Sequence, residues 1–265
     1  MRSKVYEIVN NLVVRLETAG KDEEASRSGQ NWWRNAMTSI NEAEAYRAIR
    51  RSILDGVMHA GHRLVEADLA LALGASRSYV RLALARLEFE GLVEKQPGRS
   101  ASVRRVPRSE LLEIIDARVA LEGMMARAAA TRRTDPQAQY LVRTMQDLVT
   151  LGAQSDIAGL LDAQARFHHA VLDASGKPAI ERVVQNLAAL TAQTRVRSML
   201  LPGRVPASIK EHRAITAAIL AADGGAAEAA MIHHLRNVGD AISKLPAGAL
   251  SGAYLEPKGQ AANTQ

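Results

Sequence analysis

The chain has 265 residues, of which 47% are hydrophobic, and its 34 Lys and Arg against 28 Asp and Glu give a formal net charge of +6. The lack of cysteine excludes disulfides, cysteine zinc fingers and cysteine nucleophiles, and the sequence has no uncharged apolar run of about 18 residues that could span a membrane. Aromatic residues make up only 3% of the chain, which argues against stacking of single-stranded nucleic acid and favours double-stranded DNA as the polyanion that a basic chain would bind. We expect a cytoplasmic protein without a membrane partner.

Four regions follow one another along the chain. Residues 1–40 contain one amphipathic helical piece and then a polar segment that we expect to be a flexible link. Residues 41–106 combine helical periodicity with two β-type runs and predict one domain. Residues 107–244 are helical throughout and predict a second, all-α domain, whereas residues 245–265 are rich in Pro, Gly and Ala and predict a flexible tail.

The first of these domains has the pattern of a winged helix-turn-helix. Three helical segments are expected at about 42–56, 66–73 and 77–90. The segment Leu73-Gly74-Ala75-Ser76 provides the turn before the third helix, and the Ser76 hydroxyl can cap that helix. Two β-type runs then surround Pro97-Gly98-Arg99-Ser100 and predict a wing. These runs are 92–96 and 101–105.

Basic side chains concentrate on this module. Between residues 76 and 105 there are seven Lys and Arg against three Glu, a local charge of +4. Arg77 and Arg81 project from the N-terminal half of the third helix, where a recognition helix meets base edges and phosphates. Together with Ser76 and with Arg99 of the wing, they are the predicted DNA-binding residues. The alternative is a basic helix and hairpin that contacts another protein.

The motifs of this module are Gly61-x-Arg63-Leu64-x-Glu66-x-x-Leu69-Ala70, Leu73-Gly74-Ala75-Ser76-Arg77, Val80-Arg81 and Ala83-Leu84-x-x-Leu87-Glu88-x-Glu90-Gly91-Leu92-Val93. They resemble the winged helix of the GntR family of transcription regulators over about 50 residues, which implies binding to a double-stranded DNA operator. The sequence departs from the family pattern at four positions: Ala60 and Tyr79 replace proline, Leu82 replaces glutamate and Ser100 replaces glycine.

Residues 107–244 predict a helical bundle that is divided by helix-breaking residues. About six helices are expected, at roughly 110–132, 136–151, 156–174, 178–200, 206–222 and 225–244. Three of them each point one histidine toward the apolar side: His168, His212 and His234. Their neighbours His169 and His233 fall on the outer faces. One inward histidine is ordinarily a hydrogen-bonded core residue, but three that converge can bind a divalent metal.

Further motifs in this region are Arg118-x-x-x-Glu122, Arg166-Phe167-His168, Glu211-His212-x-x-Ile215 and Met231-x-x-His234-Leu235. They resemble the FCD effector domain of FadR-type regulators over about 130 residues. The resemblance implies that His168, His212 and His234 hold a metal such as zinc or nickel. In many relatives an aspartate four residues before the first histidine completes the set. Gln164 stands at that position here, and its neutral amide is a weaker ligand.

Arg118 lies on an apolar stripe, where a charged side chain needs a partner. It is either one half of a structural ion pair with a residue such as Glu122 or the anchor for an effector carboxylate. Arg195, near the apolar face of the fourth helix, is a weaker candidate for the same role.

These observations favour a ligand-responsive transcription regulator that binds a palindromic operator as a homodimer and senses a small carboxylate. We expect it to act as a repressor. A metal-dependent hydrolase is the alternative from another class, with Glu122 or Glu211 as the candidate base, although neither has an HExxH motif. A metal-free regulator that binds an acyl ligand is the third possibility.

Overall fold

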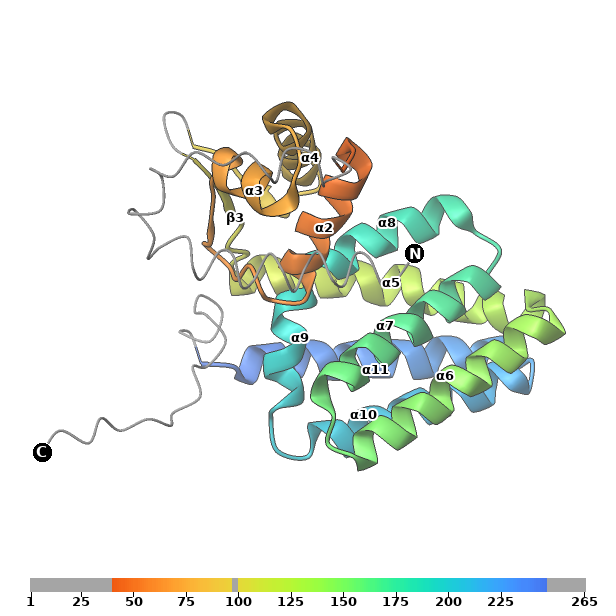
Figure 1. Cartoon of the computed structure of the whole chain (residues 1–265). Coiled ribbons are helices and arrows are strands. Elements are labelled where there is room, and N and C mark those ends of the chain that lie inside the picture. The colour runs from red at the N-terminus through yellow and green to blue at the C-terminus, as the bar shows by residue number, and fades with distance from the viewer. Residues whose placement is uncertain (1–39, 97–99, 247–265) are drawn as a thin grey trace, which may run out of the picture. The chain divides into compact units, whose positions relative to one another are not determined.

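The computed structural model describes residues 40–96 and 100–246, and these form two compact units that divide between Arg105 and Val106 (Figure 1). The expected N-terminal helical piece, Arg99 of the wing and the tail after residue 246 lie outside the described residues. The mostly helical fold class, with a winged helix-turn-helix before an all-α bundle, is confirmed. Within the described ranges, no helix is long and apolar enough to cross a membrane.

The described residues of the first unit form three helices and a small antiparallel sheet. The helices are α2 (Glu42–Leu54), α3 (Glu66–Leu73) and α4 (Arg77–Phe89). The strands are β1 (Arg63–Leu64), β2 (Val93–Glu94) and β3 (Ala101–Val103), in the order β1-β3-β2. β3 pairs through Ser102 with Arg63 on one side and with Glu94 on the other. Strand β1 was not predicted, because two residues are too few to show alternation.

Local sequence explains where the helices of this unit begin and end. α2 starts with a capping box, in which the side chains and backbones of Asn41 and Glu44 bond reciprocally. α3 ends at Gly74, whose φ of 64° is in the left-handed region that glycine tolerates best. The predicted cap of α4 is confirmed: the Tyr79 backbone N–H donates to the Ser76 hydroxyl at 3.2 Å. The inward side of α4, including Val80 and Leu87, is fully buried.

The second unit is a bundle whose described residues form seven helices. They are α5 (Arg108–Arg132), α6 (Asp135–Ala153), α7 (Ile157–Ala174), α8 (Pro178–Leu190), α9 (Ala192–Met199), α10 (Arg204–Leu220) and α11 (Gly224–Lys244). α5 packs along α11, α6 packs along α7, and α10 contacts α5, α6 and α11 (Figure 1).

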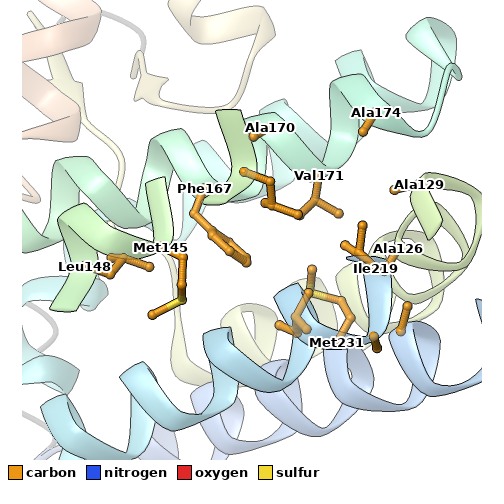
Figure 2. Packing of buried hydrophobic residues seen from close by; sticks show 14 of the residues in the cluster. Ala126, Ala129, Met145, Leu148, Phe167, Ala170, Val171, Ala174, Ile219 and Met231 are labelled. Atoms are coloured by element: carbon orange, nitrogen blue, oxygen red, sulfur yellow. The ribbon is translucent and has the colours of Figure 1, made fainter. Parts of the chain in front are cut away.

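The core of the bundle is formed by apolar residues of six helices, α5, α6, α7, α9, α10 and α11 (Figure 2). Small residues of α5, such as Ala126 and Ala129, allow close approach of the neighbouring helices. Phe167 of α7 is fully buried, and its ring lies against that of His212, with centroids 4.7 Å apart. The apolar core therefore continues directly into the histidine cluster.

One expected helix, 178–200, is two helices in the structure, because the chain bends at Thr191 between α8 and α9. The Thr191 hydroxyl donates to the carbonyl oxygen of Ala188 at 3.1 Å and accepts a hydrogen bond from Arg118 at 3.1 Å. A threonine that bonds locally to the backbone competes with helical hydrogen bonding. Periodicity alone does not show this interruption, since both halves have apolar residues at helical spacing.

Candidate metal centre and DNA-binding face

The three inward histidines lie together in the bundle. His168 comes from α7, His212 from α10 and His234 from α11, and a potential ligand atom of each lies within 4.8 Å of those of the others. The ring centroids of His212 and His234 are 4.5 Å apart, and that of His168 is 5.5 Å and 5.2 Å from them. His212 and His234 are buried, and His168 is partly buried. The outer histidines, His169 and His233, are exposed.

Each histidine of this cluster is held through its Nδ1 atom by a different acceptor. His168 Nδ1 is 2.9 Å from a carboxylate oxygen of Glu122, and His234 Nδ1 is 2.7 Å from one of Glu211. His212 Nδ1 is 2.7 Å from the carbonyl oxygen of Ser208, one turn earlier in α10. Because carbonyl and carboxylate oxygens only accept, all three Nδ1 atoms carry the hydrogen. The lone pair of each neutral ring is therefore on Nε2.

The three Nε2 atoms are the ones that would coordinate a metal ion. Within the part of the chain that the structure describes, His212 Nε2 is buried and has no hydrogen-bond partner, which is costly unless a ligand is bound there. Histidines that ligate metals commonly donate their other ring N–H to a carboxylate or a carbonyl oxygen, as all three do here. Three imidazole nitrogens that converge in this way fit zinc or nickel.

Burial, together with the charges around the cluster, keeps two of the rings neutral. Burial and the neighbouring histidines lower the pKa of His212 and of His234 well below the usual value. Burial also acts to raise the pKa of the Glu122 carboxyl, but Arg118 and His168 outweigh it and hold that pKa far below its ordinary range. At neutral pH His212 and His234 are thus unprotonated, and Glu122 is ionised.

Two ion pairs that are buried in the bundle support the carboxylates. Arg118 Nε donates to Glu122 at 2.7 Å, and Arg204 Nη1 lies 3.1 Å from both carboxylate oxygens of Glu211. Glu211 also accepts a hydrogen bond from Asn237 at 2.8 Å. The sequence interpretation missed the positioning roles of Glu211, Ser208 and Arg204. Helical spacing contained part of the signal, since Ser208 precedes His212 by one turn.

Arg118 lies on α5, is buried, and forms the ion pair that the sequence analysis left open. Its Nε bonds Glu122 and its Nη1 bonds the Thr191 hydroxyl at 3.1 Å. The Glu122 carboxylate therefore joins Arg118 to His168, one oxygen to each. The role of Arg118 as a carboxylate anchor stays a prediction. The same holds for Arg195, which is partly buried on α9.

Gln164 is buried on α7, one turn before His168. Its amide nitrogen donates to the Ser208 hydroxyl at 3.0 Å and lies 3.6 Å from the Met199 sulfur. With the nitrogen used in this way, the amide oxygen is the atom that could act as a weak metal ligand. That role for Gln164 also stays a prediction.

In the first unit, the predicted DNA-binding side chains of α4 lie on its outer side. Ser76 caps the helix, and Arg77, the first residue of α4, is exposed. Arg81 is 66% exposed and forms an ion pair with Glu66, the first residue of α3. At the base of the wing, Arg63 Nε donates to the Ser100 hydroxyl at 3.0 Å.

Comparison with known proteins agrees with both units. Residues 41–103 match the bacterial regulatory proteins of the gntR family, and residues 113–237 match the FCD domain. The chain is 31% identical over 132 residues to an HTH-type transcriptional regulator of Agrobacterium vitis, covering 48% of this chain and 77% of that protein. It is 28% identical over 212 residues to the HTH-type transcriptional regulator LutR of Bacillus subtilis, covering 72% and 96% of the two chains.

A solved structure shows the same fold. McbR/YncC of E. coli superposes with a TM-score of 0.69 at 20% identity, and the match covers 77% of this chain and 97% of that one. The matched families and the named relatives are transcription regulators, not enzymes, so the hydrolase alternative is not favoured. The chain therefore belongs to the gntR family of bacterial regulatory proteins, as a DNA-binding transcription regulator whose winged helix is followed by an FCD domain.

Proposed function

We propose that this regulator is a repressor that binds a near-palindromic operator as a homodimer in the cytoplasm, and that a small carboxylate bound next to a divalent metal releases it. The observation that carries the effector half of the proposal is the shared carboxylate of Glu122. It bonds a buried arginine, Arg118, with one oxygen and a histidine of the cluster, His168, with the other. The proposed anion anchor, Arg118, and the proposed metal ligand His168 thus contact the same carboxylate.

The metal would be held by Nε2 of His168, His212 and His234, with the Gln164 amide oxygen as a neutral further donor. A bound zinc or nickel ion would supply positive charge that attracts a carboxylate oxygen. With four neutral donors the charge of the ion is not compensated by its ligands, which favours an anionic effector. The carboxylates of Glu122 and Glu211, which accept from Nδ1 of His168 and His234, would orient the rings and make them better donors.

Arg118 would bind the effector carboxylate from α5. A buried guanidinium forms strong, directional bonds with a carboxylate because it is charged and offers paired N–H donors. Its present partners are Glu122 and Thr191, so an incoming anion would share or displace these bonds. Because Thr191 lies at the junction of α8 and α9, the anion contact would also act on the packing of these helices.

An apolar surface of α5 and α8 supports the proposed homodimer. Leu121 and Met124 of α5 and Ile180 of α8 are only partly buried around a small core cluster, and Val183 is 51% exposed. A twofold dimer would carry two copies of α4, one for each half of a palindromic operator. Analytical ultracentrifugation of Val183→Glu against the wild-type chain tests this part, since a monomeric wild type would contradict it.

The effector half is tested on the full chain purified without a histidine tag. Metal content is measured first, and a thermal-shift screen of small carboxylates is then run with and without zinc or nickel. We expect bound metal, a larger thermal shift when metal and carboxylate are both present, and release from operator DNA by the same carboxylate. A carboxylate response that is unchanged after metal removal would contradict the role of the metal, and Arg118→Met with an unchanged response would contradict the anchor.

A further inference from the structure

An acidic side chain lies on the surface that the winged helix presents to DNA. Glu66 begins α3, and α3 packs against α4, which carries Arg77 and Arg81 (Figure 1). A carboxylate in this position repels phosphate, so its presence on a basic surface requires a reason. The reason offered by the structure is its bond with Arg81.

The bond is made to one edge of the guanidinium. Arg81 Nε lies 3.3 Å and 3.2 Å from the two Glu66 carboxylate oxygens, and Arg81 Nη2 lies 3.0 Å from one of them. Nε and Nη2 form the side edge of the planar group. The end edge, formed by Nη1 and the outer hydrogen of Nη2, is not used by this ion pair. That end edge is a two-donor fork of the kind that reads O6 and N7 of guanine.

The pKa of the Glu66 carboxyl is lowered, as expected for a carboxylate bonded to Arg81. The hydrogen bond from Arg81 lowers the pKa of Glu66, and the charges of Arg81, Lys95 and Arg77 act in the same direction. Glu66 is thus ionised at neutral pH and compensates much of the charge of Arg81. An arginine whose charge is compensated is attracted less to phosphates in general, although its remaining donors keep their directions.

We propose that Glu66 is a specificity-determining residue, which holds the Arg81 guanidinium so that a single edge faces the DNA and so that Arg81 favours base contact over phosphate contact. This inference rests on the proposed role of α4 as the recognition helix. It assigns to Glu66 an effect on the ratio of specific to non-specific affinity, not on affinity alone.

The test compares Glu66→Gln with the wild type, both as full chains. The specific probe is a duplex that the wild type selects from a library with a randomised centre, and the non-specific probe is a scrambled duplex of the same composition. We expect Glu66→Gln to bind the scrambled duplex more tightly, with a salt dependence steeper by about 0.9 in log–log slope, as for one added phosphate contact. We expect the specificity ratio to fall by roughly tenfold, the order that one bidentate base contact provides.

The matched control is Asp68→Asn, because Asp68 is an exposed acid on the same helix and outside the Arg81 bond. It removes the same charge and is expected to raise both affinities equally. A second comparison places Glu66→Gln in an Arg81→Ala background, where it should no longer change the ratio. An unchanged ratio in Glu66→Gln, or an equal change with and without Arg81, overturns the inference.

The same measurements separate this inference from the proposed function. Suppose that the wild type selects a duplex and that Arg77→Ala lowers the affinity for it. If Glu66→Gln then leaves the ratio of specific to non-specific affinity unchanged, only the role of Glu66 is wrong. If the wild type selects no duplex, the recognition helix and the role of Glu66 are both wrong. Thermal unfolding of each variant confirms that the comparison is made between folded proteins.

Discussion

The His212 imidazole donates its Nδ1 hydrogen to the Ser208 carbonyl oxygen at 2.7 Å, so that its Nε2 lone pair is directed away from the backbone of its own helix. In a helix, a carbonyl oxygen ordinarily accepts a hydrogen bond from a backbone N–H one turn later. The Ser208 carbonyl oxygen also accepts from the His212 side chain, and this contact fixes the tautomer of the ring. The orientation costs free energy unless Nε2 finds a partner, because that atom is buried.

His212→Ala should lower metal content and the response to carboxylates, while DNA binding of the metal-free chain stays nearly unchanged. The ring supplies one of three converging donors, and the winged helix is a separate compact unit. Metal analysis and operator binding with and without chelator check this expectation. If the variant does not fold, His212 is mainly a core residue, and the metal site loses its strongest support.

Glu122→Gln should weaken metal binding by about 10- to 100-fold, the usual effect of losing a carboxylate that orients a metal-binding histidine. It should also destabilise the bundle by about 3–5 kcal/mol, because Arg118 is left as a buried charge without its carboxylate. Chemical denaturation and competition with a metal chelator measure the two effects. In the double variant Arg118→Met/Glu122→Gln much of the stability should return, whereas the metal affinity should not. A double variant that regains metal affinity would mean that Glu122 acts only through Arg118.

Gln164→Asp should raise metal affinity, because an ionised carboxylate is a stronger ligand than an amide. Without metal the same variant should be less stable, since the buried carboxylate then lacks the bond that Gln164 donates to Ser208. Isothermal titration with zinc and thermal unfolding with chelator give the two readouts. Gln164→Ala is the control, which should remove the hydrogen bond without adding a ligand. An affinity for zinc that is equal in both variants would place residue 164 outside the coordination sphere.

Arg77→Ala should reduce specific operator affinity by about 1–3 kcal/mol and relax base preference at one position, as expected for loss of an arginine contact to a base. Arg77 is exposed at the start of α4, so the fold should be unaffected. Gel-shift titrations with the selected duplex and with single-base variants test this. Equal losses on all sequences would indicate a phosphate contact instead.

Phe167→Ala should destabilise the bundle by about 3–5 kcal/mol, because it leaves a cavity in a core where the wild-type ring is fully buried (Figure 2). The ring also packs against His212, so the metal affinity should fall in the same variant. Phe167→Leu is the milder control, with smaller changes in both quantities. Denaturant unfolding of the metal-free chain measures the first effect separately from the second.

Much of the fold and of the candidate site could be predicted from periodicity. The inward positions of His168, His212 and His234 follow from their helical spacing, as does the outward position of His169. The turn at Gly74 and the cap at Ser76 follow from residue types with known backbone preferences. By contrast, the bend at Thr191 and strand β1 depend on contacts with residues far away in the chain, such as Arg118 and Ser102.

The winged helix-turn-helix and the all-α second domain could be predicted from the sequence, because repeating apolar positions and short motifs are local properties of the chain. The partner of each polar group, by contrast, depends on how the helices pack against one another. It paired His168 with Glu122 across 46 residues, His234 with Glu211 across 23, and Arg81 with Glu66 across 15. Such pairs form because desolvated or closely packed charges need a partner within hydrogen-bond distance, and the packing of the helices selects that partner.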